Sequence, residues 1–521
     1  MLLDLHLHES AQRRADKTAL VCGERRCTYG ELEGDANALA HALRDLGVKR
    51  QERVAVQLEN GIEAVQALFA ILKAGSVFVI INPQTKADKL AFILRDCGVR
   101  VLVTDSRQLA AAAAQLVECP ELAHVVVVDL EAHRPQGDIA PALSRAGKGV
   151  HDLLSLQSAQ PRSLPPNANI NLDLACLIYT SGSTGQPKGV TLTHLNMVTA
   201  ASAITTYLHN QPDDIILSPL PLAFDYGLYQ ALMAIRVGGT LVLEKQFAYP
   251  YRYIELIQKE RVTGLPIVPT ISAILLNLRD LDEHDFSSVR YVTNTAQALP
   301  EHHIRRLRRV MPNARLYSMY GLTECKRVAY LPPELIDRKP TSVGIAIPGT
   351  EVWIEDEQGR IITAPGQPGE LIVRGAHVMV GYWNRPEETA KALRAGRYPY
   401  ERELRTGDLF HQDEDGHLYF IARKDDLIKT AGERVGPREV ENVLHELEAV
   451  MEAAVIGVPD DILGSAIKAF VALREGGGLS EADVIKHCQR RLERFKVPKY
   501  VAFVPELPKT ATGKVSKKGL A

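Results

Sequence analysis

Residues 179–190 combine the groups that a polyphosphate site needs. The segment reads Tyr-Thr-Ser-Gly-Ser-Thr-Gly-Gln-Pro-Lys-Gly-Val and follows an apolar run of strand length at residues 174–178. It precedes residues 193–196, where Thr193 could cap a helix, so we expect a strand, a loop and a helix in this order. Glycines let backbone N–H groups approach an anion, hydroxyl groups add donors, and Lys188 supplies a positive charge. Pro187 precedes the lysine where the P-loop of many NTPases has a glycine, so the loop is of another kind. The candidate phosphate contacts are Thr180, Ser181, Gly182, Ser183, Thr184, Gly185 and Lys188.

A second group of chemically useful side chains lies at residues 320–324, which read Tyr-Gly-Leu-Thr-Glu after a strand-like run. Tyr320 offers an aromatic face, Thr323 a hydroxyl group and Glu324 a carboxylate. These groups suit a purine ring, a phosphate oxygen and a Mg²⁺ ion, respectively. An ordinary turn with an exposed glutamate would also fit this segment if it stood alone.

Together these segments resemble the signatures of the adenylate-forming superfamily, which includes acyl-CoA synthetases, aryl-CoA ligases, luciferases and amino-acid-activating adenylation domains. Further matching segments follow in the family's order at residues 405–408, 422–426 and 512–514. Members of this family convert a carboxylic acid and MgATP to an acyl-adenylate and pyrophosphate. A thiol then takes the acyl group and AMP leaves. The resemblance covers most of the chain and implies the same reaction.

The resemblance also implies roles for individual residues in binding the nucleotide. Tyr320 would stack on adenine, Thr323 would contact phosphate, and Glu324 would bind Mg²⁺. Asp408 matches the carboxylate that accepts both ribose hydroxyls, and Arg423 matches a second residue on the ribose side.

Lys514 and Asp425 match the residues that the family uses for catalysis and for domain rotation. Lys514 follows a glycine near the C-terminus, at the position of the family's catalytic lysine, where it would stabilise charge at the α-phosphate. A solvated basic tail is the plainer reading, because Lys509, Lys517 and Lys518 lie close by. Asp425 matches the pivot of the mobile C-terminal domain.

The acid pocket is less defined by the sequence. Many acyl-CoA ligases of the family carry a histidine where this chain has Phe224, whereas the pair Phe224-Asp225 resembles amino-acid-activating domains. There the aspartate holds the substrate's α-ammonium group. A structural ion pair between Asp225 and Lys326 or Arg327 is the alternative reading. The candidate pocket residues are Phe224, Asp225, Thr295, Ala296 and Lys326.

The thiol acceptor stays open between two possibilities. Lys429, Gly432 and Arg434 fall where the family forms its pantetheine tunnel. Both free coenzyme A and the phosphopantetheine arm of a carrier protein would fit such a tunnel.

The fold class expected is α/β. Helical stretches alternate with short Val/Ile-rich runs through residue 330, which predicts parallel sheets covered on both faces. Residues 131–172 are rich in proline and predict a loop excursion. Glycine-punctuated runs after residue 341 predict a small β-rich subdomain. We place the domain boundary at Asp425, giving an adenylation domain at 1–424 and a mobile α+β domain at 425–521.

Composition excludes several other classes of protein. Lys and Arg (61) nearly balance Asp and Glu (63), so the net charge does not favour binding to nucleic acid. The seven cysteines lack metal-ligand spacing and predict reduced thiols in a cytoplasmic protein. The first residues lack a basic n-region and a long apolar h-region, so we expect them not to be a signal peptide. We also expect no membrane span, because no uncharged apolar run reaches the ~18 residues that one needs.

The function predicted is ATP-dependent, AMP-forming activation of a carboxylic acid and its transfer to a thiol. An amino-acid–carrier-protein ligase, marked by Asp225, is the alternative within enzymes. A nucleotide-binding regulator without catalysis is the alternative outside them. The presence of both Glu324 and Lys514 argues against the regulator.

Overall fold

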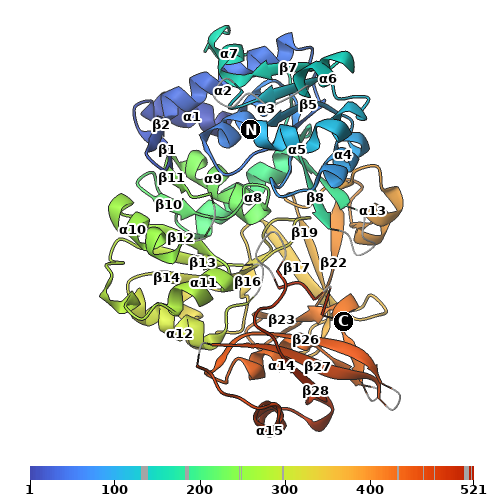
Figure 1. Ribbon diagram of the computed structural model, residues 1–521. Coiled ribbons are helices and arrows are strands. Elements are labelled where there is room, and N and C mark those ends of the chain that lie inside the picture. The colour runs from blue at the N-terminus through green and yellow to red at the C-terminus, as the bar shows by residue number, and fades with distance from the viewer. Residues whose placement is uncertain are drawn as a thin grey trace.

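The chain forms two α/β units, a β-rich unit and a C-terminal α+β unit (Figure 1). The computed structural model describes residues 1–130, 139–181, 187–245, 247, 249–295, 298–430, 433–460, 463–474, 476–509, 515–517 and 519–520.

The first α/β unit contains an eight-stranded sheet that is parallel over its six strands from β8 to β7. Two antiparallel strands, β9 and β20, extend it at one edge. In spatial order the strands are β20 (Gly381–Tyr382), β9 (Pro187–Thr193), β8 (Leu174–Ser181), β4 (Val77–Ile80), β3 (Arg53–Gln57), β5 (Val99–Thr104), β6 (His124–Val127) and β7 (Gly149–Asp152).

The second α/β unit contains a nine-stranded sheet, also parallel in its centre. The chain enters this sheet first through β1 and β2 and returns to it from β10 onward. In spatial order the strands are β16 (Ile345–Ala346), β15 (Ala329–Tyr330), β14 (Arg315–Tyr320), β13 (Tyr291–Asn294), β12 (Gly264–Ile267), β10 (Ile215–Ser218), β11 (Thr240–Leu243), β1 (Thr18–Cys22) and β2 (Arg25–Thr28).

Helices pack on these sheets, and some of them begin with a capping residue that can be recognised in the sequence. Thr193 accepts a hydrogen bond from the Asn196 N–H at the start of α8, and the Asn196 side chain accepts one from the Thr193 N–H. The helices are α1 (Leu5–Arg14), α2 (Tyr29–Asp45), α3 (Ile62–Lys73), α4 (Ala87–Asp96), α5 (Ser106–Val117), α6 (Ile139–Arg145), α7 (Leu153–Ser158), α8 (His194–Tyr207), α9 (Asp225–Val237), α10 (Pro250–Glu260), α11 (Pro269–Leu276), α12 (Glu301–Val310) and α13 (Pro386–Ala392). Short 3₁₀ turns are η1 (Leu281–Glu283) and η2 (Pro333–Leu335).

The β-rich unit is an antiparallel sheet whose long strand β22 bulges at residues 406–408. Glu370 pairs with Leu409 and Ile372 with Arg405, so β22 carries extra residues between those pairs. Gly407 adopts φ +71° in this bulge, a conformation that favours glycine. The strands are β18 (Ile361–Ile362), β17 (Thr350–Glu355), β19 (Gly369–Gly375), β22 (Arg402–Gln412), β21 (Leu393–Ala395) and β23 (Leu418–Arg423).

The C-terminal unit follows the 3₁₀ turn η3 (Lys424–Asp426). It has one two-stranded and one three-stranded sheet with helices packed on them. Its elements are β24 (Ile428–Thr430), β25 (Glu433–Val435), α14 (Pro437–Leu444), β26 (Val450–Asp460), β27 (Gly464–Leu473), α15 (Glu481–Arg491), η4 (Arg494–Lys496) and β28 (Tyr500–Phe503).

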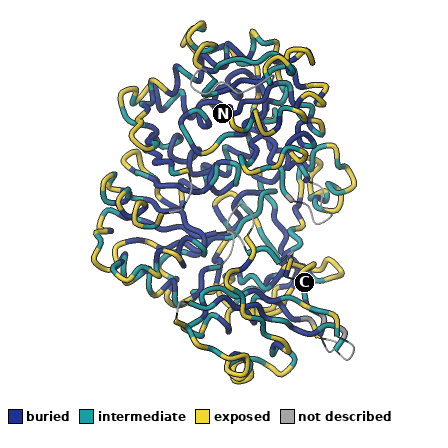
Figure 2. Tube along the Cα trace, in the orientation of Figure 1, coloured by how far each residue is buried: buried dark blue, intermediate teal, exposed yellow. Residues whose placement is uncertain are grey.

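One large hydrophobic core runs through both α/β units and the β-rich unit, and Figure 2 shows the strands of the large sheets as mostly buried. Val54 and Phe78 share a core with α2 and α3, whereas Ala55 and Val79 share another with α4 and α5. The eight-stranded sheet is therefore covered on both faces, as predicted. Among the described residues, the core around Ile428 contains only residues of the C-terminal unit.

The structure corrects three expectations about local structure. Residues 131–172 are not a plain excursion, because their described part contains α6, β7 and α7, and β7 completes the edge of a sheet. The phosphate segment runs into a second strand, β9, before its helix, so the local order is strand, loop, strand and helix. Strand β27 was not expected, because its stability comes from the long pairing with β26.

Candidate active site

The phosphate segment begins in β8 and ends in β9, two antiparallel neighbours that we call the phosphate hairpin. Thr180 pairs with Lys188, so these two predicted contacts lie side by side on neighbouring strands. Gly182, Ser183, Thr184 and Gly185 lie outside the described residues, as does the side chain of Ser181. Thr180 and Lys188 are the predicted phosphate contacts whose side chains lie within the described part of the chain.

Lys188, Tyr382 and Glu324 lie together beside this hairpin. The Tyr382 hydroxyl donates a 2.7 Å hydrogen bond to Glu324 Oε1. The Lys188 Nζ lies 5.6 Å from the centroid of the Tyr382 ring, within the range of a cation–π interaction. The tyrosine thus contacts both a predicted phosphate ligand and the predicted metal ligand.

The strand β20 places Tyr382 there. Tyr382 pairs with Val190 of β9, and the Trp383 N–H donates a 2.8 Å hydrogen bond to the Gly189 carbonyl. The Met379 N–H donates to the Glu324 carbonyl at 2.8 Å. Sequence reasoning missed Tyr382, because no local spacing connects it with residues so distant along the chain.

Tyr320, Asp408 and Arg423 form a second group. The Tyr320 hydroxyl donates a 2.5 Å hydrogen bond to Asp408 Oδ2. Asp408 and Arg423 are direct partners across β22 and β23, and Arg423 Nε lies 3.5 Å from Asp408 Oδ1. Phe410 and Phe420 pack against the Tyr320 ring at centroid distances of 4.8 and 6.4 Å. The structure therefore brings together the three residues expected around adenine and ribose.

The bulge in β22 and the burial around it determine the chemistry of Asp408. Thr406 Oγ1 accepts a 3.1 Å hydrogen bond from the Asp408 N–H and donates one to the Leu371 carbonyl, which fixes the bulge. Burial raises the pKa of Asp408 to about 6, while the nearby Arg423 charge and the Tyr320 hydroxyl act to lower it. Its carboxylate is therefore ionised near neutral pH but close to its titration point.

Glu324 has the properties of a ligand for a hard cation. Its carboxylate is half-buried and forms no ion pair with any cation among the described residues. Tyr382 occupies only one oxygen. Mg²⁺ takes oxygen ligands and is commonly held by one or two carboxylates together with phosphate oxygens and water. The side chains that surround Glu324 therefore fit this ion.

Asp225 and Lys326 are both buried on the acid side of the site. Asp225 begins α9 after Phe224, and 7% of it is exposed. The Lys326 ammonium donates a 2.8 Å hydrogen bond to the Thr323 carbonyl, and burial lowers its pKa. The described residues include no cation within ion-pair distance of Asp225, so the structural ion pair with Lys326 or Arg327 is not formed. Asp225 and Lys326 therefore interact only by electrostatic attraction over a longer distance.

The other predicted pocket residues are placed only in part. Arg327 is buried over the Tyr226 ring, with its guanidinium carbon 4.7 Å from the ring centroid. Thr295 is buried directly after β13. Ala296 lies outside the described residues.

Several predicted residues of the C-terminal unit also lie beyond the described part of the chain. These are Lys514 and Gly432, together with the side chains of Lys429 and Arg434. Asp425 is described and lies exposed in η3, between the last strand of the β-rich sheet and the first strand of the C-terminal unit. Arg438 of α14 donates a 2.7 Å hydrogen bond to the Ala298 carbonyl. This bond joins the C-terminal unit to the second α/β unit.

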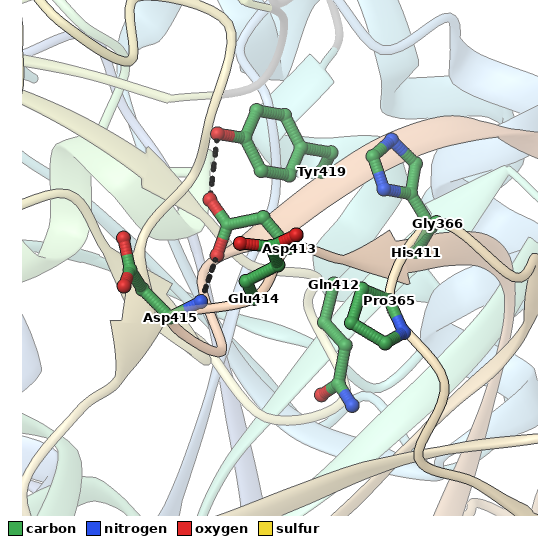
Figure 3. Close-up of a pocket in the computed structure, with 8 residues that line it drawn as sticks. All are labelled: Pro365, Gly366, His411, Gln412, Asp413, Glu414, Asp415 and Tyr419. Carbon is green, nitrogen blue, oxygen red and sulfur yellow. Dashed lines mark hydrogen bonds between the residues drawn. The ribbon is translucent and has the colours of Figure 1, made fainter.

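A surface pocket lies in another part of the β-rich unit, between the turn at Pro365 and the turn that joins β22 and β23 (Figure 3). There the Tyr419 hydroxyl donates a 3.0 Å hydrogen bond to Asp413. Asp413, Asp415 and His417 lie close enough for a metal site, but the Lys339 ammonium contacts all three. None of the predicted site residues lines this pocket.

No helix in the described ranges is long and apolar enough to cross a membrane.

Comparisons with known proteins agree with this geometry. Residues 7–383 match the family described as AMP-binding enzyme, and residues 439–514 match its C-terminal domain. A long-chain-fatty-acid–CoA ligase of Bacillus subtilis (strain 168) is 33% identical over 529 residues, covering 99% of this chain and 93% of that protein. An indoleacetate–CoA ligase of Aromatoleum aromaticum is 35% identical over 509 residues, covering 96% and 94%. A crystal structure of an anthranilate CoA ligase in complex with anthranoyl-AMP matches with a TM-score of 0.90 at 29% identity, covering 100% and 96%.

The fold and the nucleotide site define an adenylate-forming acid–thiol ligase. The chain belongs to the AMP-binding enzyme family. Its activity is the ATP-dependent, AMP-forming activation of a carboxylic acid to an acyl-adenylate, followed by thioester formation.

Proposed function

We propose that residues 320–324 hold the two ends of MgATP. The supporting observation is that Tyr320 contacts Asp408, expected at the ribose, while Glu324 contacts Tyr382 beside the phosphate hairpin. A nucleoside group and a phosphate group are thus fixed to opposite ends of one short segment. Mg²⁺ bound by Glu324 would neutralise charge on the phosphate oxygens.

The chain's own residues then divide the work of adenylation. Arg423 and Asp408 bind the ribose, and the Lys188 ammonium binds the phosphate oxygens. A carboxylate oxygen of the acid forms a bond to the α-phosphorus, and the bond from that phosphorus to the bridging oxygen of pyrophosphate breaks. Lys514 stabilises the negative charge that builds around the α-phosphate. In the second step a thiol sulfur bonds to the acyl carbon, the thiol proton is lost, and AMP leaves.

We propose coenzyme A as the thiol acceptor and a carboxylic acid as the acyl donor. The names of the relatives support coenzyme A, because they describe ligases that join acids to it. The phosphopantetheine of a carrier protein is the alternative acceptor.

A second candidate, an acid that carries an amine, is favoured by one observation. Asp225 is buried yet lacks an ion-pair partner among the described cations. A buried carboxylate without a partner is costly, and a substrate ammonium group would supply one. Anthranilate, named for the structural neighbour, is itself an amine-bearing acid.

We also propose that the chain divides at Asp425 into an adenylation domain and a mobile C-terminal domain. The separate core around Ile428 supports this boundary. So does the change of sheet between β23 and β24.

The experiment is a screen of acids for ATP–pyrophosphate exchange, with thioester formation measured in the presence of coenzyme A. Fatty acids, aromatic acids, amine-bearing aromatic acids and amino acids form the panel. Exchange with at least one acid class and formation of its CoA thioester are expected. Exchange without any CoA thioester would contradict coenzyme A as acceptor. Exchange limited to acids without an amine would contradict the second candidate.

A further inference from the structure

We propose that Tyr382 is a positioning residue that keeps Lys188 and Glu324 apart and orients the Glu324 carboxylate toward the metal. The proposal rests on the function proposed above, because it concerns the same MgATP site. It adds a residue for which no spacing in the sequence suggested a role.

The first support is the hydrogen bond between Tyr382 and Glu324. The hydroxyl donates to Oε1 at 2.7 Å, which fixes the carboxylate's rotation and leaves Oε2 for another partner. An ionised carboxylate only accepts hydrogen bonds, so the tyrosine hydroxyl is the donor in this contact.

The second support is the position of Lys188 over the ring face of the tyrosine. Its ammonium lies over the ring face at 5.6 Å and does not lie within ion-pair distance of Glu324. A lysine and a glutamate that paired directly would neutralise each other before any ligand arrived. The ring therefore leaves the cation for phosphate and the carboxylate for Mg²⁺.

The third support is the rigidity of the strand that carries Tyr382. The Tyr382 N–H donates a 2.9 Å hydrogen bond to Thr389 Oγ1, which itself donates to the Arg385 carbonyl at 2.7 Å. Gly381 adopts φ +152°, and a β-carbon there would come within 2.7 Å of the Thr389 side chain. The helix α13 thus packs so closely on this strand that only glycine fits before the tyrosine.

The test compares Tyr382→Phe with Glu324→Gln and wild type by calorimetry, measuring ATP binding with Mg²⁺ and with EDTA, and AMP binding. Tyr382→Phe keeps the ring over Lys188 and removes only the hydroxyl. We expect it to weaken MgATP binding about 10-fold, the typical effect of losing one hydrogen bond to a charged group. Binding of AMP and of ATP in EDTA should stay within about twofold of wild type, since neither uses the carboxylate's metal contact.

Tyr419→Phe is the matched control, because its hydroxyl also donates to a carboxylate, that of Asp413, in the separate pocket of Figure 3. It should bind MgATP as wild type does. Unchanged AMP binding shows that each variant is folded. Equal MgATP binding by Tyr382→Phe and wild type, with a loss for Glu324→Gln, would overturn the role of Tyr382 alone. If Glu324→Gln also kept its magnesium dependence, the metal assignment and this proposal would both be wrong.

Discussion

The Tyr320 hydroxyl donates a 2.5 Å hydrogen bond to Asp408, which joins the end of β14 to the bulge in β22. This bond connects the second α/β unit with the β-rich unit. The bond also fixes the Asp408 carboxylate beside the expected adenine site. Burial disfavours the charged form of this carboxylate. The contacts of ATP would thus be assembled from two units, through residues that lie 88 positions apart in the sequence.

Asp408→Asn should weaken ATP binding and remove one source of pH dependence. Because burial raises the pKa of Asp408 to about 6, the folded protein binds a proton at a pH where an unfolded aspartate has lost it. The free energy of unfolding therefore falls as the pH rises through the range from about 4 to 6. Nucleotide affinity moves the opposite way, since the ribose hydroxyls need the ionised form.

The asparagine variant should flatten both profiles. We expect its free energy of unfolding at pH 7 to be higher than that of wild type by about 1–3 kcal/mol. The reason is that asparagine has no charge to bury, whereas the Asp408 carboxylate is ionised at pH 7 in spite of its burial. ATP should bind about 10-fold more weakly, because a charged acceptor is replaced by a neutral one. Chemical denaturation and calorimetry at pH 5 and pH 7 measure both effects. An unchanged ATP affinity would contradict the ribose assignment.

Lys514→Ala should slow adenylation while sparing thioester formation. Loss of one well-placed electrostatic donor typically costs roughly 10²–10³ in rate, so pyrophosphate exchange should fall by at least that factor. Transfer from synthetic acyl-adenylate to the thiol should stay near the wild-type rate.

Lys517→Ala provides the control for Lys514, because Lys517 forms a 2.8 Å ion pair with Glu441 in the body of the C-terminal unit. A solvated basic tail without a catalytic role would make the two substitutions equally mild. Equal exchange rates for both variants would therefore refute the assignment of Lys514.

Asp225→Ala should separate the two classes of acid substrate. If Asp225 binds a substrate ammonium group, the variant should lose exchange with amine-bearing acids and keep its melting temperature, because no described cation pairs with Asp225. Asp225→Asn should lose the same activity, since it keeps the shape but not the charge. A drop in melting temperature with equal loss for every acid would instead indicate a structural role.

Asp425→Pro should trap one arrangement of the two domains. Proline fixes φ and removes an N–H donor, whereas a hinge residue must change its backbone angles. One half-reaction should stay near its normal rate and the other should slow at least about 10-fold, with Asp425→Ala as the control that keeps backbone freedom. Equal slowing of both half-reactions would refute the pivot.

The sequence predicted the elements whose signals are local. Fully apolar runs such as residues 77–81 became buried central strands, and the cap at Thr193 starts α8 as expected. Strand β27 and strand β9 were not predicted, because their stability comes from pairing with β26 and β8 rather than from their own composition.

The candidate active site was also predictable only where its residues lie in short local motifs. Tyr320, Glu324 and Asp408 were found from short motifs, but the bond between Tyr320 and Asp408 depends on two sheets coming together. Tyr382 could not be found, because a tyrosine after a glycine is an ordinary pair of residues. The missing ion pair of Asp225 could not be foreseen either, since Lys326 bonds to a backbone carbonyl instead.

In the proposed reaction a carboxylate oxygen of the acid attacks the α-phosphorus of ATP. The most direct measurement uses an acid, chosen by the exchange screen, with both carboxylate oxygens labelled with ¹⁸O, and analyses the nucleotide product by mass spectrometry after thioester formation. We expect AMP that carries one labelled oxygen, with pyrophosphate unlabelled. Unlabelled AMP, or ADP and phosphate as products, would contradict it.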